Sequence, residues 1–193
     1  MDYPYPYQIV TDLFKPTVSS SIMADFPKID RAGRFQSNHF SLNELWQQLL
    51  AELNAMPFRE QLEQLFEINL ANKPSVVTLC GVSNRRDGRA QGDAKGKLLS
   101  VLLFMNPPWQ ATAGRFRILN QAHNMEDYTE EVLPEMGTAL IYKPGVKTFH
   151  GYPKFVGRRQ VLCLEYFASD VDISRYLLPQ SPFARLKQLL LRV

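Results

Sequence analysis

Histidine is scarce in this chain of 193 residues, and one of the three histidines lies in a context that suggests chemistry. His39 and His123 lie outside any recognisable motif, whereas His150 lies on a predicted strand just before a turn. Nine residues later, Arg159 opens a mostly apolar run. Burying an arginine without a partner is costly, so Arg159 must either reach solvent or hold a buried anion.

A carboxylate, Asp93, follows the polar loop at residues 85–89 and precedes an apolar run at residues 98–105. In an extended segment, residues two apart project from the same face. We therefore expect Gln91 and Asp93 to point the same way, into any cavity that the strands enclose. Taken alone, this stretch is typical of a solvated turn.

Several segments follow one another in an order that resembles a known family. They are Asp87–Lys97, Leu98–Asn106 with Pro108-Trp109, Gly114–Leu119, Pro134–Leu140, Phe149–Gly151 and Gly157–Leu162. The order resembles that of iron(II)/2-oxoglutarate-dependent dioxygenases of the prolyl 4-hydroxylase-like branch. That family has an H-x-D motif, an L-N-x-x-W-like turn, a G-G-x-L-R-L-like strand, a distal W/F-H-G and a final R-x-x-(I/L). Because Ala24–Pro27 and the C-terminal segment also resemble bacterial members, the resemblance covers nearly the whole chain.

The resemblance implies an iron site and a pocket for 2-oxoglutarate. In this family two histidines and a carboxylate hold iron(II) and leave three positions open for the 2-oxo acid and dioxygen. By resemblance, Asp93 matches the carboxylate ligand, His150 the distal histidine, and Arg159 the residue that pairs with the far carboxylate of 2-oxoglutarate. Arg158 is a nearby competitor for that last role, and we expect Arg159 to lie beside Lys95 or another polar group. No catalytic group is expected apart from the metal site.

Position 91 departs from the family pattern. The proximal histidine of H-x-D should lie two residues before Asp93, where this chain has Gln91. An amide oxygen is a poor ligand for iron(II) beside an imidazole nitrogen. We therefore expect iron to bind weakly, or not at all, at Asp93, His150 and Gln91.

Three functions stay open at this point. The first is a 2-oxoglutarate/iron(II)-dependent oxygenase that hydroxylates an unidentified substrate. The second is a catalytically degenerate member of that family that acts as a binding module. The third is a nucleic-acid-binding protein that uses the basic loop from Arg85 to Lys97. The acidic residues in this loop and its lack of interleaved aromatic side chains disfavour the third function.

The elements that must position these residues change from helices to strands along the chain. The S-x-x-E pattern from Ser41 to Glu44 predicts a helix capped by Ser41, and Pro57 predicts the first turn of a second helix. Ser181 similarly predicts the start of a C-terminal helix. Strands are predicted at Ser75–Val82, Lys97–Met105, Arg115–Leu119, Thr138–Tyr142, Thr148–Tyr152 and Gln160–Phe167. This order predicts a mainly β fold with flanking helices (α+β): a double-stranded β-helix (jelly roll, cupin-like) with an N-terminal helical layer and a C-terminal helix.

Length and composition fit one domain over residues 1–193, with helical support at about 1–74, a β-helix core at about 75–168 and a C-terminal helix at about 181–191. The net charge of +3 suits a small anionic ligand and falls short of the bias of a dedicated nucleic-acid binder. Cys80 and Cys163 belong to no C-x-x-C pair, which favours buried thiols in a reducing compartment. The absence of a signal-peptide pattern or a membrane-length apolar run predicts a cytoplasmic protein.

Overall fold

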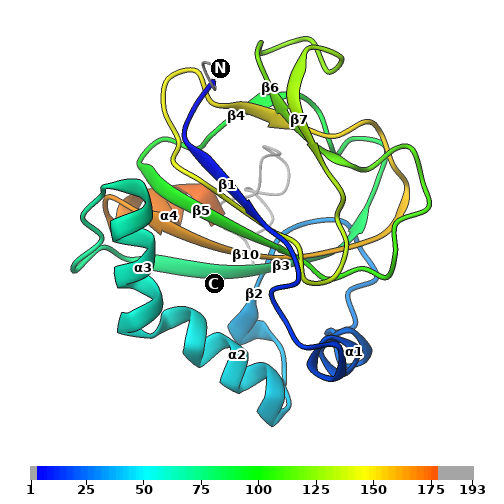
Figure 1. Cartoon of the computed structure of the whole chain (residues 1–193), viewed down its shortest axis with the longest axis vertical. Coiled ribbons are helices and arrows are strands. Elements are labelled where there is room, and N and C mark those ends of the chain that lie inside the picture. Colours follow the sequence, from blue (N-terminus) through cyan, green and yellow to red (C-terminus); the bar gives the residue numbers. More distant parts are fainter. Residues whose placement is uncertain (1–3, 178–193) are drawn as a thin grey trace, which may run out of the picture.

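The computed structural model describes residues 4–177, in which two antiparallel sheets face each other (Figure 1). The larger sheet contains, in spatial order, β1 (Tyr7–Val10), β8 (Ala139–Tyr142), β5 (Lys97–Phe104), β10 (Gly157–Phe167), β3 (Ser75–Ser83) and β2 (Phe35–Gln36). The smaller sheet contains β4 (Gln91–Gly92), β9 (Phe149–Gly151), β6 (Phe116–Leu119) and β7 (Tyr128–Val132). This arrangement confirms the predicted jelly-roll fold class.

Helices cover the outer face of the larger sheet, on the side opposite the smaller sheet (Figure 1). They are α1 (Pro16–Ala24), α2 (Glu44–Asn54) and α3 (Met56–Phe66), with a short 3-10 turn at Ser37–His39. A further helix, α4 (Asp170–Leu177), follows β10 and packs separately, with Tyr176 against Val76 and Phe167. Trp46 of α2 is fully buried in this layer, and its indole nitrogen donates a hydrogen bond to the Ile22 carbonyl at 3.2 Å. The helices α1, α2 and α3 therefore cover the larger sheet from outside, and its inner face is turned toward the smaller sheet.

The start of α2 differs from the prediction. The capping side chain is Asn43, whose Oδ1 accepts a hydrogen bond from the Trp46 backbone nitrogen at 3.0 Å. The predicted cap at Ser41 was therefore wrong by two residues, because Asn43 is itself a strong capping residue and lies directly before the helix. Pro57 lies in the first turn of α3, as its fixed φ favours.

The alternation of side chains along the central strands separates two apolar layers. On β5, Leu99, Val101 and Leu103 pack with the helices, whereas Leu102 and Phe104 pack between the sheets. On β10, the even-numbered Leu162 and Leu164 face the helices in the same way. Because successive side chains of a strand point to opposite faces, a polar residue in register with Leu102 or Phe104 faces the interior between the sheets.

All six predicted strands correspond to strands of the structure, with ends that differ by a few residues. The sequence did not predict β1, β2, β4, β7 or α4. The predicted helix at Ser181–Leu191 lies outside the described residues. Within residues 4–177, no helix is both long enough and apolar enough to cross a membrane.

Candidate functional site

A row of three polar side chains crosses the inner face of the larger sheet at one end. Glu165 of β10 pairs with Ser100 of β5, and Ser100 pairs in turn with Tyr142 of β8. Directly paired residues on neighbouring antiparallel strands project from the same face. All three residues are at most 2% exposed, so this row forms the floor of a buried polar site.

Lys97 joins two carboxylates above this row. Its ammonium nitrogen lies 2.7 Å from Asp93 Oδ1 and 2.6 Å from Glu165 Oε1, and all three side chains are nearly inaccessible to solvent. Burial by itself lowers the pKa of Lys97, but the charges of Glu165 and Asp93 outweigh burial and raise it. Lys97 is therefore cationic at neutral pH. The Tyr142 hydroxyl also donates to Asp93 Oδ1, at 3.4 Å.

His150 lies beside Asp93, as the predicted metal site requires. Its ring stacks on Phe116 with centroids 5.4 Å apart and lies 5.6 Å from the ring of Tyr142. His150 Nδ1 lies 3.5 Å from Asp93 Oδ2, and neither atom has a hydrogen-bond partner. Burial lowers the pKa of His150 to about 4, so the imidazole is neutral at pH 7.

The short strand β4 brings Gln91 to the same place. Gln91 is paired directly with His150 of β9, so the two side chains share one face of the smaller sheet. His150 is buried and Gln91 is exposed, which places Gln91 at the rim of the site. The structure therefore brings Asp93, His150 and Gln91 together.

These residues do not form a complete iron(II) triad. The described part of the chain contains no cluster of three or more histidine, cysteine, aspartate or glutamate side chains that could hold a metal ion. Asp93 Oδ2 and His150 Nδ1 are unpartnered and close enough to share one divalent ion, but the third position offers only an amide. Asp93 Oδ1 is moreover already bound to Lys97. The donor set is thus two ligands and an amide, which is a poor set for iron(II).

Arg159 lies at the other end of the interior, where an irregularity in the pairing of β10 with β3 separates Arg158 from Val161. The side chain of Asn106 holds this segment by bonding both backbone groups of Gln160, with its Oδ1 accepting from the nitrogen at 2.6 Å and its Nδ2 donating to the carbonyl oxygen at 2.9 Å. Arg159 is consequently buried, whereas Arg158 is exposed.

The guanidinium of Arg159 is only partly satisfied. Its Nε donates to the Gly114 carbonyl at 2.8 Å, and its central carbon lies 3.9 Å from the ring centre of Tyr152 and 5.6 Å from that of Phe104. Nη2 is buried and has no hydrogen-bond partner. Burial lowers the pKa of Arg159, although an arginine remains charged at neutral pH. Gly114 and two rings surround this guanidinium, while Lys95 is exposed on the turn after Asp93.

The approach of Arg159 to the backbone depends on the conformation of Gly114. This glycine has a φ of +83°, and a Cβ there would lie 2.7 Å from the Trp109 ring. Any other residue would therefore be strained and would displace Trp109. The indole of Trp109 is itself fixed, because its nitrogen donates to the Ala113 carbonyl at 2.9 Å.

Sequence reasoning missed Lys97, Glu165 and Tyr142. Glu165 carried a usable signal, because a carboxylate inside an apolar strand must find a cationic or hydrogen-bonding partner. Lys97 opens the same strand that carries Ser100, but nothing in its spacing distinguishes it from the exposed Lys95. The identity of its partners depends on the pairing of β5 with β10.

The basic loop considered for nucleic-acid binding divides into exposed and buried parts. Arg85, Arg86 and Arg89 are exposed, whereas Lys97 turns inward to two carboxylates. The loop therefore offers a smaller basic surface than its composition indicates.

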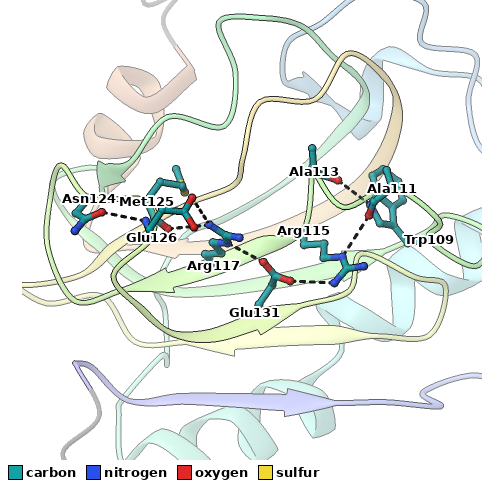
Figure 2. A network of polar contacts seen from close by, with 9 residues as sticks. All are labelled: Trp109, Ala111, Ala113, Arg115, Arg117, Asn124, Met125, Glu126 and Glu131. Carbon is teal, nitrogen blue, oxygen red and sulfur yellow. Dashed lines mark hydrogen bonds and ion pairs between the residues drawn. The ribbon is translucent and has the colours of Figure 1, made fainter.

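A second polar network lies on the outer side of the smaller sheet (Figure 2). Glu131 of β7 binds two arginines of the neighbouring segment, Arg115 at 3.1 Å and Arg117 at 2.7 Å. Arg117 also contacts Glu126 at 2.8 Å and donates to the Met125 carbonyl at 3.1 Å. Because Glu126 and Met125 belong to the loop between β6 and β7, this network fixes the loop to the sheet.

The fold and the arrangement of Asp93, His150 and Arg159 can be compared with known proteins. Neither protein-family models nor curated protein sequences match this sequence, so the comparison rests on solved structures. Many of these match, and the fold is that of the iron(II)/2-oxoglutarate oxygenases of the prolyl 4-hydroxylase-like type.

Three of the matching structures illustrate the likeness. A prolyl-4-hydroxylase from Pseudomonas putida is 14% identical, with a TM-score of 0.59 over 86% of this chain and 94% of its own. A prolyl 4-hydroxylase from Phytophthora capsici is 13% identical, with a TM-score of 0.59 over 95% of this chain and 68% of its own. HygX from Streptomyces hygroscopicus, solved with nickel and 2-oxoglutarate, is 9% identical, with a TM-score of 0.55 over 85% of this chain and 83% of its own.

Proposed function

We propose that this protein is a small-molecule binding module built on the oxygenase fold, which holds a carboxylate ligand at Arg159 and has lost efficient iron-dependent hydroxylation. One observation carries the proposal: the buried guanidinium of Arg159 presents Nη2 to the interior without a partner. Leaving a buried donor unsatisfied costs about 1–3 kcal/mol, and more for a charged group. A carboxylate would satisfy it with a charge-assisted hydrogen bond.

Two further observations support this proposal. HygX was solved with 2-oxoglutarate bound, so a fold of this kind can hold such an acid, and 2-oxoglutarate is a reasonable first ligand to test. The incomplete donor set at Asp93, His150 and Gln91 argues against efficient turnover of that acid. The free thiols of Cys80 and Cys163 are compatible with the reducing cytoplasm, where we place the protein.

The proposal is tested by calorimetric titration of the protein with 2-oxoglutarate, glutarate and short monocarboxylates in the presence of a metal chelator. Arg159→Ala should lose carboxylate binding, and the exposed neighbour in Arg158→Ala should retain it. If no carboxylate binds, or if Arg158→Ala loses binding and Arg159→Ala does not, the assignment of Arg159 is wrong.

A second candidate function is a working oxygenase that holds iron(II) with Asp93, His150 and Gln91. The observation that favours it is the proximity of Asp93 Oδ2 and His150 Nδ1, both buried and unpartnered, with Gln91 paired directly with His150. Anaerobic titration with iron(II), followed by measurement of succinate formation from 2-oxoglutarate in air, separates the two functions. Iron-dependent succinate formation by the natural protein would replace the binding-module proposal with this one.

A further inference from the structure

We propose that the ligand of this interior is an amino carboxylate, with a carboxylate at one end bound by Arg159 and an ammonium at the other end bound by Asp93 and Glu165. This inference rests on the proposed function, because it assumes that Arg159 holds a carboxylate. It goes further by naming the chemical group at the opposite end of the ligand.

The Asp93 end of the interior has two carboxylates and one ammonium that is ion-paired with both. Lys97 contacts one oxygen of Asp93 and one oxygen of Glu165. The second oxygen of each carboxylate, Asp93 Oδ2 and Glu165 Oε2, is buried and has no hydrogen-bond partner. Among the described residues, Lys97 is the only lysine or arginine that pairs with either carboxylate. Arg34, which also approaches this end, lies over the ring of Tyr176 at 4.4 Å. The hydroxyls of Ser100 and Tyr176 are also buried without partners at this end, but they are neutral. Two carboxylates thus share one ion-paired ammonium, which leaves an excess of negative charge that a further cation would balance.

The opposite end has the reverse polarity, because Arg159 Nη2 is a buried donor without an acceptor. Between the two ends, the inner faces of β5, β8 and β10 carry the apolar residues Leu102, Phe104, Leu140 and Val161. Ring contacts connect the ends: His150 stacks on Phe116 at 5.4 Å, and Phe116 lies 6.3 Å from Phe104, which Arg159 overlies. The interior thus has an acceptor end, an apolar middle and a donor end.

The span sets the size of the ligand. Ser100 lies in the polar row, and Phe104, four residues further along β5, lies under Arg159. At about 3.3 Å per residue, these two positions are about 13 Å apart along the strand. Because the long side chains of Arg159 and Glu165 can extend into this span from either end, a linear ligand of four to six carbons suits the remaining distance.

A dicarboxylate fits this pattern poorly. Its second carboxylate would meet Asp93 Oδ2 and Glu165 Oε2, and like charges at short distance repel. An ammonium in that place would instead donate charge-assisted hydrogen bonds to both oxygens. In a complete oxygenase site the metal would supply positive charge at this end, and here the donor set for that metal is incomplete. We therefore expect selection for an amino group over a second carboxylate.

The test compares ligands of matched length on the natural protein, in the presence of a chelator. Calorimetric titration with 5-aminopentanoate, glutarate and pentanoate separates the contribution of the amino group from that of the carboxylate, and 4-aminobutanoate and 6-aminohexanoate vary the length. We expect at least one of the amino carboxylates to bind on the order of tenfold more tightly than the matched dicarboxylate and monocarboxylate, which corresponds to about 1.4 kcal/mol. Arg159→Ala should abolish this binding.

Two variants localise the amino end. Asp93→Asn and Glu165→Gln should each reduce the preference for the amino carboxylate over the dicarboxylate, while Glu52→Gln, on the exposed face of α2, should leave it unchanged. If either site variant fails to fold, the ligand comparison on the natural protein still decides the question.

The outcomes separate this inference from the proposed function. If glutarate binds more tightly than 5-aminopentanoate and depends on Arg159, the amino-carboxylate inference is overturned and the carboxylate-binding function stands. If no carboxylate of any kind binds, both are overturned. If the amino carboxylates bind equally well to Arg159→Ala, the ligand lies elsewhere and both assignments are again overturned.

Discussion

The ammonium nitrogen of Lys97 lies 2.7 Å from Asp93 Oδ1, in an ion pair whose two side chains are each only 5% exposed. The pair joins the turn after β4 to the first residue of β5. Glu165 binds the same ammonium from the neighbouring strand β10. Lys97 therefore serves the fold and the site at once, because it fixes one oxygen of Asp93 and leaves the other toward His150.

Replacing Lys97 by methionine should destabilise the protein strongly. The substitution keeps most of the side-chain volume but leaves Asp93 and Glu165 buried without a cation. Breaking a buried ion pair by removing one partner costs about 3–5 kcal/mol. Urea denaturation measures the loss in unfolding free energy, and Lys95→Met, at an exposed position on the same turn, should change it by less than about 0.5 kcal/mol. A loss below about 1 kcal/mol for Lys97→Met would show that the pair is not buried in solution.

Gln91→His should create a third protein ligand beside Asp93 and His150. Mutating a residue that only hydrogen-bonds a metal ligand changes metal affinity by about 10–100-fold. A direct ligand should contribute at least as much, so we expect at least a tenfold gain in iron(II) affinity. Anaerobic titration with iron(II) or cobalt(II) measures this affinity. Lys95→His adds an imidazole to the same turn at an exposed position and should give no such gain. Equal affinities for the natural protein and Gln91→His would mean that these residues do not frame a metal site.

The stability of the protein should fall as the pH is lowered from about 6.5 to about 4. The pKa of His150 is about 4 in the folded protein, below the ordinary value of 6.5, so the unfolded chain takes up the proton first. The stabilising contribution of the neutral imidazole is therefore complete above pH 6.5 and is lost as the pH falls through this window. Its full size is about 3 kcal/mol, to order of magnitude.

Urea denaturation at several pH values, with a chelator present, measures this dependence. His150→Asn should flatten the curve between pH 6.5 and 5, where few carboxylates titrate. The exposed His39 provides a matched control, and His39→Asn should retain the slope of the natural protein. If His150→Asn and the natural protein lose stability in parallel over this range, His150 titrates normally and is not buried.

Arg117→Ala should loosen the loop between β6 and β7. Arg117 is the residue that joins Glu131 of the sheet to Glu126 and Met125 of the loop (Figure 2). We expect faster amide hydrogen exchange over residues 120–127 and a loss of about 1.5–3 kcal/mol in unfolding free energy, since hydrogen bonds to charged groups contribute about that much. Glu126→Gln should have a small effect because Glu126 is 77% exposed. If amide hydrogen exchange in this loop is unchanged in Arg117→Ala, the loop is held by its own backbone contacts and not by Arg117.

The parts of the fold that the sequence predicted are those in which local pattern and burial agree. The strands β3, β5, β8 and β10 are apolar runs bounded by turn residues, and all were predicted. β4 and β7 were missed because β4 has two residues and β7 is largely polar, so neither presents the alternation that a half-buried strand requires. Asn43 was missed as a helix cap because two candidate capping residues compete within three positions.

The candidate site was predictable to the extent that it follows a motif order. Asp93, His150 and Arg159 were named by resemblance, and the first two lie together in the structure. Lys97 and Glu165 could not be assigned as partners from sequence, because their contact depends on the register between β5 and β10. Which of Arg158 and Arg159 points inward likewise depends on the irregular pairing of β10, which the sequence does not reveal.

Because β4 has only two residues, the position of Gln91 in the site is weakly fixed. Gln91 is aligned with His150 by a pairing of only two residues at the edge of the smaller sheet. A shift by one residue would turn its side chain to the opposite face, and so short an edge strand opens at little free-energy cost. Gln91 can therefore leave the site when β4 opens, whereas Asp93 is held in place by its ion pair with Lys97. A ligand that binds Gln91 would therefore stabilise the pairing of β4 with β9 at this edge of the smaller sheet.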